Sequence, residues 1–416
     1  MTDLQLINSK KDMKVLVCNA ETENSLGVIR SLGRRGIPVI AAFSQFFAKG
    51  RWSKYVSKAI KEPLTDTPDQ YVKWLISTTK EHGVNVFLPT ADILVWIASN
   101  WRDEIKQYIR VPLAPKEILD IALRKDLTCK ACQEYGVPYP RTYYPVSYQE
   151  LKSLANEIEY PVIVKPRTSV GVILEGKGFV ANSKEELVSK FRANRFKQFM
   201  QPYLEQDPAL EWPLVQEFVR GEITNLYAIA TVFNTNSKPT GIFCGRKIRQ
   251  WPVQMGVGTL TESSYNADAV RASIRLLRRI RWEGAVATEI KKDSKDGEFK
   301  IIELNPRTHS WTWLAVETGV DIPYLWYRHA CGDIDSPKAV VSKGNLAWLY
   351  WLTDLFGLPS QLSFAEDRRK FIKQYLGSLG RDKVHAVLNK KDPLPFFADL
   401  INALRYVPSY IKRLRQ

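Results

Sequence analysis

Two glutamates and an asparagine stand on a predicted β-hairpin, and their side chains have the chemistry of a metal site. Residues 284–305 form two strand patterns joined by a polar loop with an Asp-Gly turn dipeptide. Glu289 and Glu303 then face each other approximately, and Asn305, two residues further on, shares the face of Glu303. Opposed carboxylates repel unless a cation neutralises them, and Mg²⁺ prefers carboxylate and amide oxygens. A surface hairpin with ordinary charges is the weaker alternative, because Ile301, Ile302 and Leu304 mark the second strand as buried.

The first part of the chain has the pattern of a separate α/β domain. Residues 14–112 alternate short apolar strands with amphipathic helices, which predicts an open parallel sheet. Glu21 and Asp92 follow two of these strands, at the edge where ligands enter such sheets, and we expect them to contact substrate. Helix capping is the competing interpretation for polar residues at these positions. The glycine fingerprint of a dinucleotide site is absent.

The middle of the chain reads as a helical linker followed by a mixed α/β segment. A proline-rich stretch near residue 140 marks a boundary, after which YPVIVKP and PLVQEFV are strand patterns of the buried type. The arginine-rich helix predicted over 268–281 has an apolar face, so its arginines are interpreted as a solvated face. Cys129 and Cys132 form a C-x-x-C without a second pair, which favours helix packing over a zinc site.

Several segments together resemble a known family. IIELNPR at 301–307, preceded by VATEIKKD, is similar to the metal-binding motif of the ATP-grasp superfamily, particularly its carboxylate-amine ligases. ALRKDLTCKACQEYGVPYPRT, YPVIVKP, VQEFVRGE and GRKIRQWPVQMGVGT match in the same order, over roughly residues 14–335. The resemblance implies an α/β and α+β fold: a parallel-sheet domain, two α+β subdomains and a helical C-terminal extension. The expected domains are 1–114 (Rossmann-like), 115–220 (linker and small subdomain), 221–335 (large subdomain) and 336–416 (basic extension).

The resemblance also implies a nucleotide site. Lys125 and Lys165 resemble the two lysines that meet the phosphates, and Glu222 resembles the acid that accepts from the ribose hydroxyls. The segment expected to hold the adenine edge comprises Gln216, Glu217, Phe218 and Val219. The phosphate-covering loop departs from the family, since its glycines are spread apart in RTSVGVILEGKG. Ser169 and Gly171 are therefore its expected phosphate contacts on weaker grounds.

The reacting groups are implied in the same way. Glu289, Glu303 and Asn305 are similar to the ligands of Mg²⁺, with Mn²⁺ as an alternative, and Arg307 to the arginine at the γ-phosphate or acyl phosphate. The residues that resemble those facing the reacting carboxylate are Lys247, Arg249, Gly256, Gly258 and Thr259. His309 follows the metal motif, and a substrate contact and a structural histidine are both open for it.

The implied reaction joins a carboxylate to an amine, such as an amino acid, with ATP consumed through an acyl phosphate. A non-catalytic nucleotide-binding module, regulatory or membrane-associated, is the alternative, although the retained glutamates, Asn305 and Arg307 speak against it. The motifs do not name the acid or the amine, and a carboxylate derived from CO2 is also compatible with them. Specificity lies in the first domain and the loops, where analogy of fold ends.

Bulk composition concerns partners and location. The net charge is +16, and residues 361–416 hold twelve Lys or Arg against five Asp or Glu, so this stretch supplies +7. No nucleic-acid motif accompanies that charge, and we expect small-molecule partners, no nucleic acid, and a homodimer. Five cysteines and no recognisable leader or spanning segment indicate the cytoplasm. The basic amphipathic end, residues 395–416, either contacts the inner face of an anionic membrane or packs back on the catalytic body.

Overall fold

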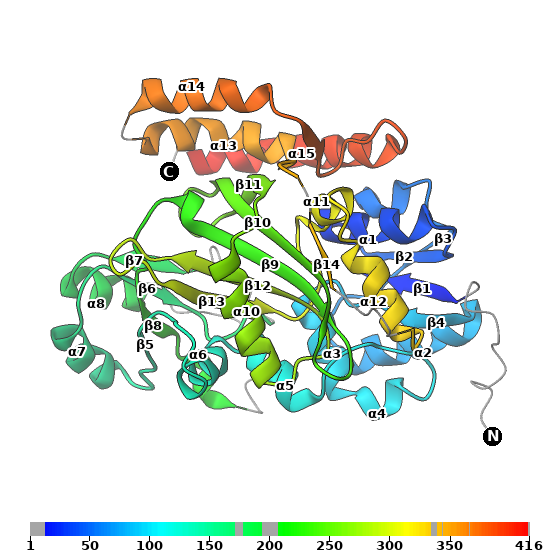
Figure 1. The fold of residues 1–416 in the computed structure, drawn as a ribbon, viewed down its shortest axis with the longest axis horizontal. Coiled ribbons are helices and arrows are strands. Elements are labelled where there is room, and N and C mark those ends of the chain that lie inside the picture. The colour runs from blue at the N-terminus through cyan, green and yellow to red at the C-terminus, as the bar shows by residue number, and fades with distance from the viewer. Residues whose placement is uncertain are drawn as a thin grey trace.

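Three sheets organise the chain in a computed structural model that describes residues 13–170, 178–193, 207–333, 339–342, 344–365 and 367–414 (Figure 1). Gly171 and the end of the segment 395–416 lie outside the described residues. The side chains of 406–414 are likewise not described, although their backbone is helical.

The N-terminal sheet has the order β3-β2-β1-β4 and all its pairs are parallel, as predicted. Its strands are β1 (Lys14–Val17), β2 (Val39–Phe43), β3 (Lys58–Lys61) and β4 (Val84–Phe87). Its helices are α1 (Glu23–Gly33), α2 (Pro68–His82), α3 (Asp92–Asn100) and α4 (Arg102–Ile105). Strands β1, β2 and β4 are apolar and almost wholly buried, as strands covered on both faces must be.

The linker and the small sheet follow. Helices α5 (Lys116–Leu123) and α6 (Lys125–Glu134) lead into the antiparallel order β5-β8-β6-β7. These strands are β5 (Thr142–Tyr143), β6 (Val162–Lys165), β7 (Phe179–Ala181) and β8 (Leu214–Glu217), with α7 (Tyr148–Glu157) and α8 (Lys184–Ala193) beside them. The small sheet has a core of its own, formed by residues such as Leu151, Val164 and Val215. Cys129 and Cys132 are buried in α6, which confirms helix packing for this pair.

The large sheet has the order β13-β12-β9-β10-β11-β15-β16, and β14 pairs with β10. Its strands are β9 (Leu226–Phe233), β10 (Pro239–Trp251), β11 (Val257–Ser263), β12 (Gly284–Lys292), β13 (Phe299–Asn305), β14 (Val340–Val341), β15 (Ala347–Leu349) and β16 (Lys383–His385). Helices α10 (Ala267–Arg279), α11 (Thr312–Glu317) and α12 (Ile322–Ala330) cover it. The arginines of α10 are exposed while Val270, Leu276 and Leu277 are buried, as the helical pattern predicts.

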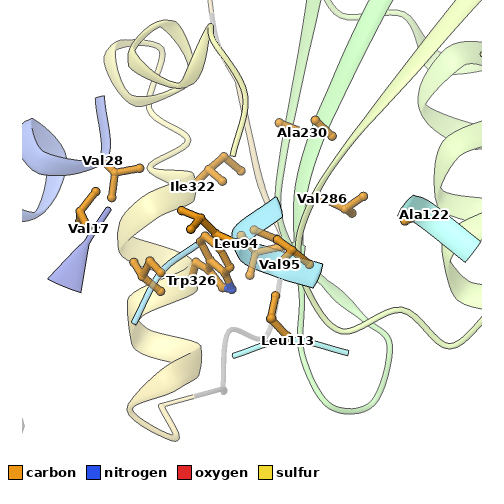
Figure 2. Packing of buried hydrophobic residues seen from close by; sticks show 14 of the residues in the cluster. Val17, Val28, Leu94, Val95, Leu113, Ala122, Ala230, Val286, Ile322 and Trp326 are labelled. Carbon is orange, nitrogen blue, oxygen red and sulfur yellow. The ribbon is translucent and has the colours of Figure 1, made fainter. Parts of the chain in front are cut away.

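One core joins the N-terminal domain to the large sheet. Figure 2 shows Val17 and Val28 on one side, Ala230 and Val286 on the other, and Trp326 of α12 between them. The indole N–H of Trp326 donates to the carbonyl of Pro112 at 2.7 Å, so the buried ring has a polar partner in the interdomain segment. Because these residues are buried together, the first domain is held rigidly against the sheet that carries the predicted metal hairpin.

The C-terminal extension is helical, as expected, but it also belongs to the large sheet. Its helices are α13 (Trp351–Phe364), α14 (Arg368–Leu379) and α15 (Leu394–Leu414), and they lie as a layer over the end of the sheet near β11 (Figure 1). Strand β15 pairs antiparallel with β11, and β16 pairs parallel with β15. The first turns of α15 pack back on the N-terminal domain, where Asn402 donates to the carbonyl of Phe47. No helix among the described residues is long and apolar enough to span a bilayer.

Candidate active site

The predicted hairpin is formed by β12 and β13, and its register places Glu289 directly opposite Glu303. Asn305 pairs with Ala287, two residue pairs further along the hairpin, and therefore lies on the face of Glu303. Like charges directly opposite each other destabilise a sheet, so this pair requires compensation. Within the described part of the chain, no three His, Cys, Asp or Glu side chains converge. A site of two carboxylates and one amide fits Mg²⁺, which keeps several waters and nucleotide phosphates as its other ligands.

Two lysines from separate elements converge on this hairpin. Lys125 begins α6, and its Nζ lies 3.6 Å from Oε1 of Glu303 and donates to Oγ of Ser169 at 2.7 Å. Ser169 in turn donates to Glu303 Oε1 at 3.4 Å. Lys165 ends β6, and burial followed by the charge of Lys125 lowers its pKa. An ammonium pair beside two carboxylates, on elements of two different lobes, is suited to a polyanionic ligand.

A glycine explains how the chain passes so close to Lys165. Gly178 has φ +140°, and a Cβ at this position would stand 2.1 Å from the carbonyl oxygen of Val164. Only glycine adopts that backbone conformation without strain. The far end of the phosphate-covering loop is therefore held against the strand that carries Lys165.

Arg307 connects the metal motif to the N-terminal domain. Its Nε and one terminal nitrogen donate to the two oxygens of Asp92 at 2.8 and 3.0 Å, and that same nitrogen donates to Oδ1 of Asn305 at 3.1 Å. Burial is the largest single influence and lowers the pKa of Arg307, but the charge and hydrogen bonds of Asp92 together with the charges of Glu303 and Glu289 exceed it, and the net direction is upward. Asp92, the first residue of α3, thus fixes a permanent cation beside the predicted metal ligands.

A cavity of about 430 Å³ opens between Asp92 and the strand ends of the N-terminal sheet. Ser169 and Arg307 form part of its wall, so it borders the lysine and glutamate cluster. Three carboxylates stand in the rest of its wall, together with other polar residues and the apolar Ala91 and Ile93. The remaining lining comprises Asn19, Thr22, Glu23, Asn24, Thr65, Asp66, Thr90, Ala91, Asp92, Ile93 and Ser310. Glu21, predicted to contact substrate, is not among these residues. Its Oε1 accepts from the backbone N–H groups of Ser44 and Gln45 and holds the loop after β2.

One wall residue of the cavity depends on a buried carboxyl group whose pKa is strongly shifted. The backbone N–H of Asn19 donates to Glu62 Oε1 at 2.7 Å, and the hydroxyl of Tyr71 donates to Oε2 at 2.8 Å. Burial raises the pKa of Glu62 from its ordinary 4.5 to about 7. Asn19 itself has φ +56°, so its conformation depends on such contacts.

Glu62 therefore predicts a pH dependence of stability. The folded protein retains the Glu62 proton between pH 4.5 and 7 whereas the unfolded chain releases it, so this contribution is complete below pH 4.5 and is lost as pH rises through 7. The loss amounts to on the order of 3 kcal/mol. In urea unfolding at pH 5 and pH 8, we expect Glu62→Gln to lose less stability than the wild type across this interval. Equal losses in the two proteins would contradict the assignment.

The segment predicted to hold adenine already uses some of its backbone groups. The N–H of Glu217 donates to Arg141 and that of Phe218 to Pro161, while the carbonyl of Val219 accepts from Lys291 Nζ at 2.8 Å. Gln216 is buried and donates to Thr142 Oγ1. Glu222 is exposed just beyond this segment, and its Oε2 accepts from Thr224 Oγ1 at 3.2 Å.

The residues predicted to face the reacting carboxylate lie on β10, on β11 and in the loop between them, and they fall into two groups. Lys247 is buried and its Nζ donates to the carbonyl of Gly256 and to Gln250 Oε1, both at 3.3 Å. Gly258 lies against the indole of Trp311, and a Cβ there would stand 2.9 Å from its Nε1. Gly258 is thus close to the turn that follows the metal motif.

Arg249 and Thr259 point elsewhere. The Arg249 guanidinium forms two hydrogen bonds with the Asp354 carboxylate, at 3.0 and 2.7 Å, and a third with Ser378 Oγ at 2.8 Å. Thr259 Oγ1 donates to the same carboxylate at 2.6 Å. The expected contact of Arg249 with a reacting carboxylate is thus replaced by a carboxylate of α13. The sequence alone did not point to Asp354, which stands about a hundred residues further along the chain.

His309 is a neutral imidazole enclosed by aromatic rings. Its ring centroid lies 5.8 Å from each of the rings of Phe243 and Trp311. Burial, and then the charge of Arg307, lowers the pKa of His309 to about 3. Neither ring nitrogen has a hydrogen-bond partner among the described residues. A base of such low pKa accepts protons poorly at neutral pH, so His309 is not suited to act as a general base.

The chain is similar in sequence to a known protein family and to individual enzymes. The family described as "Carbamoyl-phosphate synthase L chain, ATP binding domain" matches residues 124–334. A D-aspartate ligase of Enterococcus faecium is 22% identical over 318 residues, covering 72% of this chain and 72% of that protein. The carbamoyl phosphate synthase large chain of Hyperthermus butylicus is 30% identical over 231 residues, which are 54% of this chain but only 20% of that protein.

Solved structures agree at the level of the fold. A biotin carboxylase complex of Campylobacter jejuni has a TM-score of 0.61 and 17% identity, with 80% of this chain and 73% of that chain covered. An L-amino acid ligase of Bacillus licheniformis has a TM-score of 0.59 and 14% identity, with 78% and 77% covered.

Proposed function

The chain belongs to the ATP-grasp superfamily, and from this premise we propose that it is a magnesium-dependent ligase that uses ATP to join a carboxylate to an amine. The observation that carries the proposal is the convergence of Lys125 and Ser169 on Glu303, directly opposite Glu289. This arrangement combines cations for phosphate with oxygens for Mg²⁺, and the two come from different lobes. Mn²⁺ would satisfy the same oxygens.

The reaction we propose needs no protein nucleophile. A substrate carboxylate oxygen attacks the γ-phosphorus of ATP, and the bond to the β-phosphate oxygen breaks to give an acyl phosphate and ADP. The amine then attacks the acyl carbon, phosphate leaves with one carboxylate oxygen, and the amine proton is lost to solvent. When bound by Glu289, Glu303 and Asn305, Mg²⁺ would neutralise phosphate charge. Lys125, Lys165 and Arg307 would hold the transferred group by charge.

The cavity supports an amine-bearing acceptor, such as an amino acid. Glu23, Asp66 and Asp92 place three carboxylates in its wall, against the single arginine Arg307. Such a lining attracts an ammonium group, which must lose a proton before it reacts. The names of two similar proteins, a D-aspartate ligase and an L-amino acid ligase, are consistent with an amino acid in this role.

The proposal is tested by phosphate release from ATP and Mg²⁺ in the presence of pools of carboxylates and pools of amino acids, supplied separately and together. We expect release to depend on one member of each pool. Nucleotide binding without release in any combination would instead support a non-catalytic nucleotide-binding module. Release that requires bicarbonate and no other acid would identify a carboxylate derived from CO2.

Asp92 offers a test of how Arg307 is positioned. Asp92→Ala removes both acceptors of the Arg307 fork, so we expect kcat to fall about 10- to 100-fold while the KM for ATP changes little. Asp92→Glu should recover part of the rate because it restores the charge. The matched control is Asp103→Ala, an exposed carboxylate of α4, which should behave as wild type. Wild-type kcat in Asp92→Ala would show that the arginine needs no such partner.

A further inference from the structure

The layer formed by α13, α14 and α15 faces solvent with apolar side chains. Of the eighteen large hydrophobic residues that are exposed in the described chain, eleven lie between residues 351 and 404. They are Trp351, Leu355, Phe364, Ile372, Leu376, Leu379, Leu388, Leu394, Phe397, Ile401 and Leu404. Single exposed hydrophobic residues are ordinary, but such a concentration on one helical layer indicates a partner surface.

Two of these helices bury polar side chains while they expose large apolar ones. Helix α13 turns Asp354 and Gln361 inward beside Leu352, and exposes Trp351 and Leu355 one turn apart. An ordinary amphipathic helix buries its apolar stripe and exposes its charges. The buried carboxylate of Asp354 is satisfied by Arg249, so this inward polar contact attaches the helix to β10.

Helix α15 has a similar pattern. Its inward face carries Asp399, which pairs with Lys49 at 3.0 Å, beside the buried Ala398, whereas Leu394, Phe397, Ile401 and Leu404 follow helical spacing on the exposed face. The two apolar faces adjoin, because the ring of Trp351 lies 6.0 Å from that of Phe396 on α15.

Helix α14 adds a further exposed apolar stripe. Tyr375 and Ser378 face Arg249 and the body, while Ile372, Leu376 and Leu379, spaced by four and three residues, are exposed. Together these stripes make the outer surface of the layer, which we call the apolar helix face, defined by the exposed hydrophobic residues of α13, α14 and α15.

The charge beside the apolar helix face is almost entirely positive. Exposed basic residues of the layer are Arg368, Arg369, Lys370, Lys373, Arg381, Lys390, Lys391 and Arg405. Three acidic residues, Asp354, Asp392 and Asp399, are buried in ion pairs with the body, and the exposed acidic residues described here are Asp367 and Asp382. Exposed apolar stripes bordered by lysine and arginine are the composition of a surface that lies on anionic lipid.

We propose that the apolar helix face docks on an anionic membrane surface. In a symmetric dimer the same patch would meet its own copy, and the basic residues would repel across the interface. Anionic headgroups attract those residues while the apolar stripes enter the boundary of the acyl chains. The docking surface is therefore the outer face of three helices, and not the basic end at 395–416 alone.

The test is vesicle cosedimentation of the full chain. We expect binding to vesicles of phosphatidylcholine with 30% phosphatidylglycerol, about tenfold weaker or absent binding to phosphatidylcholine alone, and weakening with added salt. Leu376→Glu with Phe397→Glu should abolish binding to the anionic vesicles. The matched control places the same two charges at exposed hydrophobic residues elsewhere, as Val146→Glu with Tyr265→Glu, and should bind as wild type.

Three results would overturn the proposal. Wild-type protein that stays in the supernatant with anionic vesicles would do so, whatever the behaviour of the variants. Equal binding to anionic vesicles by Leu376→Glu with Phe397→Glu and by the control Val146→Glu with Tyr265→Glu would also overturn it. Light scattering that shows a dimer converted to a monomer by Leu376→Glu with Phe397→Glu, with no vesicle binding by the wild type, would assign the face to a second copy. Arg369→Glu with Lys373→Glu provides a variant that preserves the apolar stripes, and it should also weaken binding.

Discussion

Glu303→Gln should lower the rate of ATP-dependent phosphate release at least about 100-fold while the fold and the melting temperature stay close to wild type. The substitution keeps the size of the side chain but removes the charge that balances Lys125 and would hold a divalent cation opposite Glu289. Cation neutralisation of a transferred phosphoryl group is worth several kcal/mol, and each 1.4 kcal/mol is tenfold in rate.

The control for this substitution lies in the same hairpin. Glu298 is exposed in the loop between β12 and β13, so Glu298→Gln makes the identical chemical change away from the site and should leave the rate unchanged. Removing the repulsion between Glu289 and Glu303 should leave the variant as stable as wild type or slightly more stable. A Glu303→Gln protein with wild-type activity would remove the metal assignment.

Asp392→Ala should destabilise the folded protein by about 3–5 kcal/mol. Asp392 is buried and accepts from Nε of Arg30 at 2.9 Å, from Ser53 Oγ at 2.8 Å and from the backbone N–H of Lys54 at 2.8 Å. Arg30 is fully buried, so loss of the carboxylate leaves a cation in the interior without its counter-charge. Urea unfolding followed by tryptophan fluorescence measures the change.

The double variant Arg30→Met with Asp392→Leu removes both charges of the ion pair and leaves apolar side chains in their place. Because an apolar pair of similar volume has no charge to desolvate, we expect this double variant to be more stable than Asp392→Ala alone. The control is Asp103→Ala, which removes an exposed carboxylate and should change the free energy of unfolding by less than about 0.5 kcal/mol. A loss below about 1 kcal/mol in Asp392→Ala would mean that the attachment of the C-terminal extension to α1 contributes little.

Local patterns in the sequence predicted the elements that depend on periodicity. The parallel strands β1, β2 and β4 are continuous apolar runs, and the hairpin that carries Glu289 and Glu303 has an evident turn. Edge strands gave weaker signals: β3, with the sequence KAIK, is mostly exposed and has no apolar run. The register of Glu289 against Glu303 required the structure, since a loop length is fixed by sequence only to within a residue.

Contacts between distant segments could not be predicted in this way. Arg249 was expected beside a reacting carboxylate, but its position on β10 brings it to Asp354 of α13, a pairing decided by how the extension folds back. Asp92 was expected to contact substrate; it lines the cavity and also holds Arg307, a pairing that the sequence did not indicate. Neither pair has a sequence spacing that a helix or strand period would reveal. Both are side-chain contacts made only when the domains assemble.

The most direct measurement of the proposed mechanism follows the carboxylate oxygen. With the acid and amine that support phosphate release, the acid is labelled with ¹⁸O in its carboxylate and the released phosphate is analysed by mass spectrometry. Attack of the carboxylate on the γ-phosphorus predicts one ¹⁸O in each phosphate, in an amount equal to the amide formed. Phosphate without the label, formed while amide accumulates, would contradict an acyl phosphate and with it the proposed reaction at the Glu289 and Glu303 site.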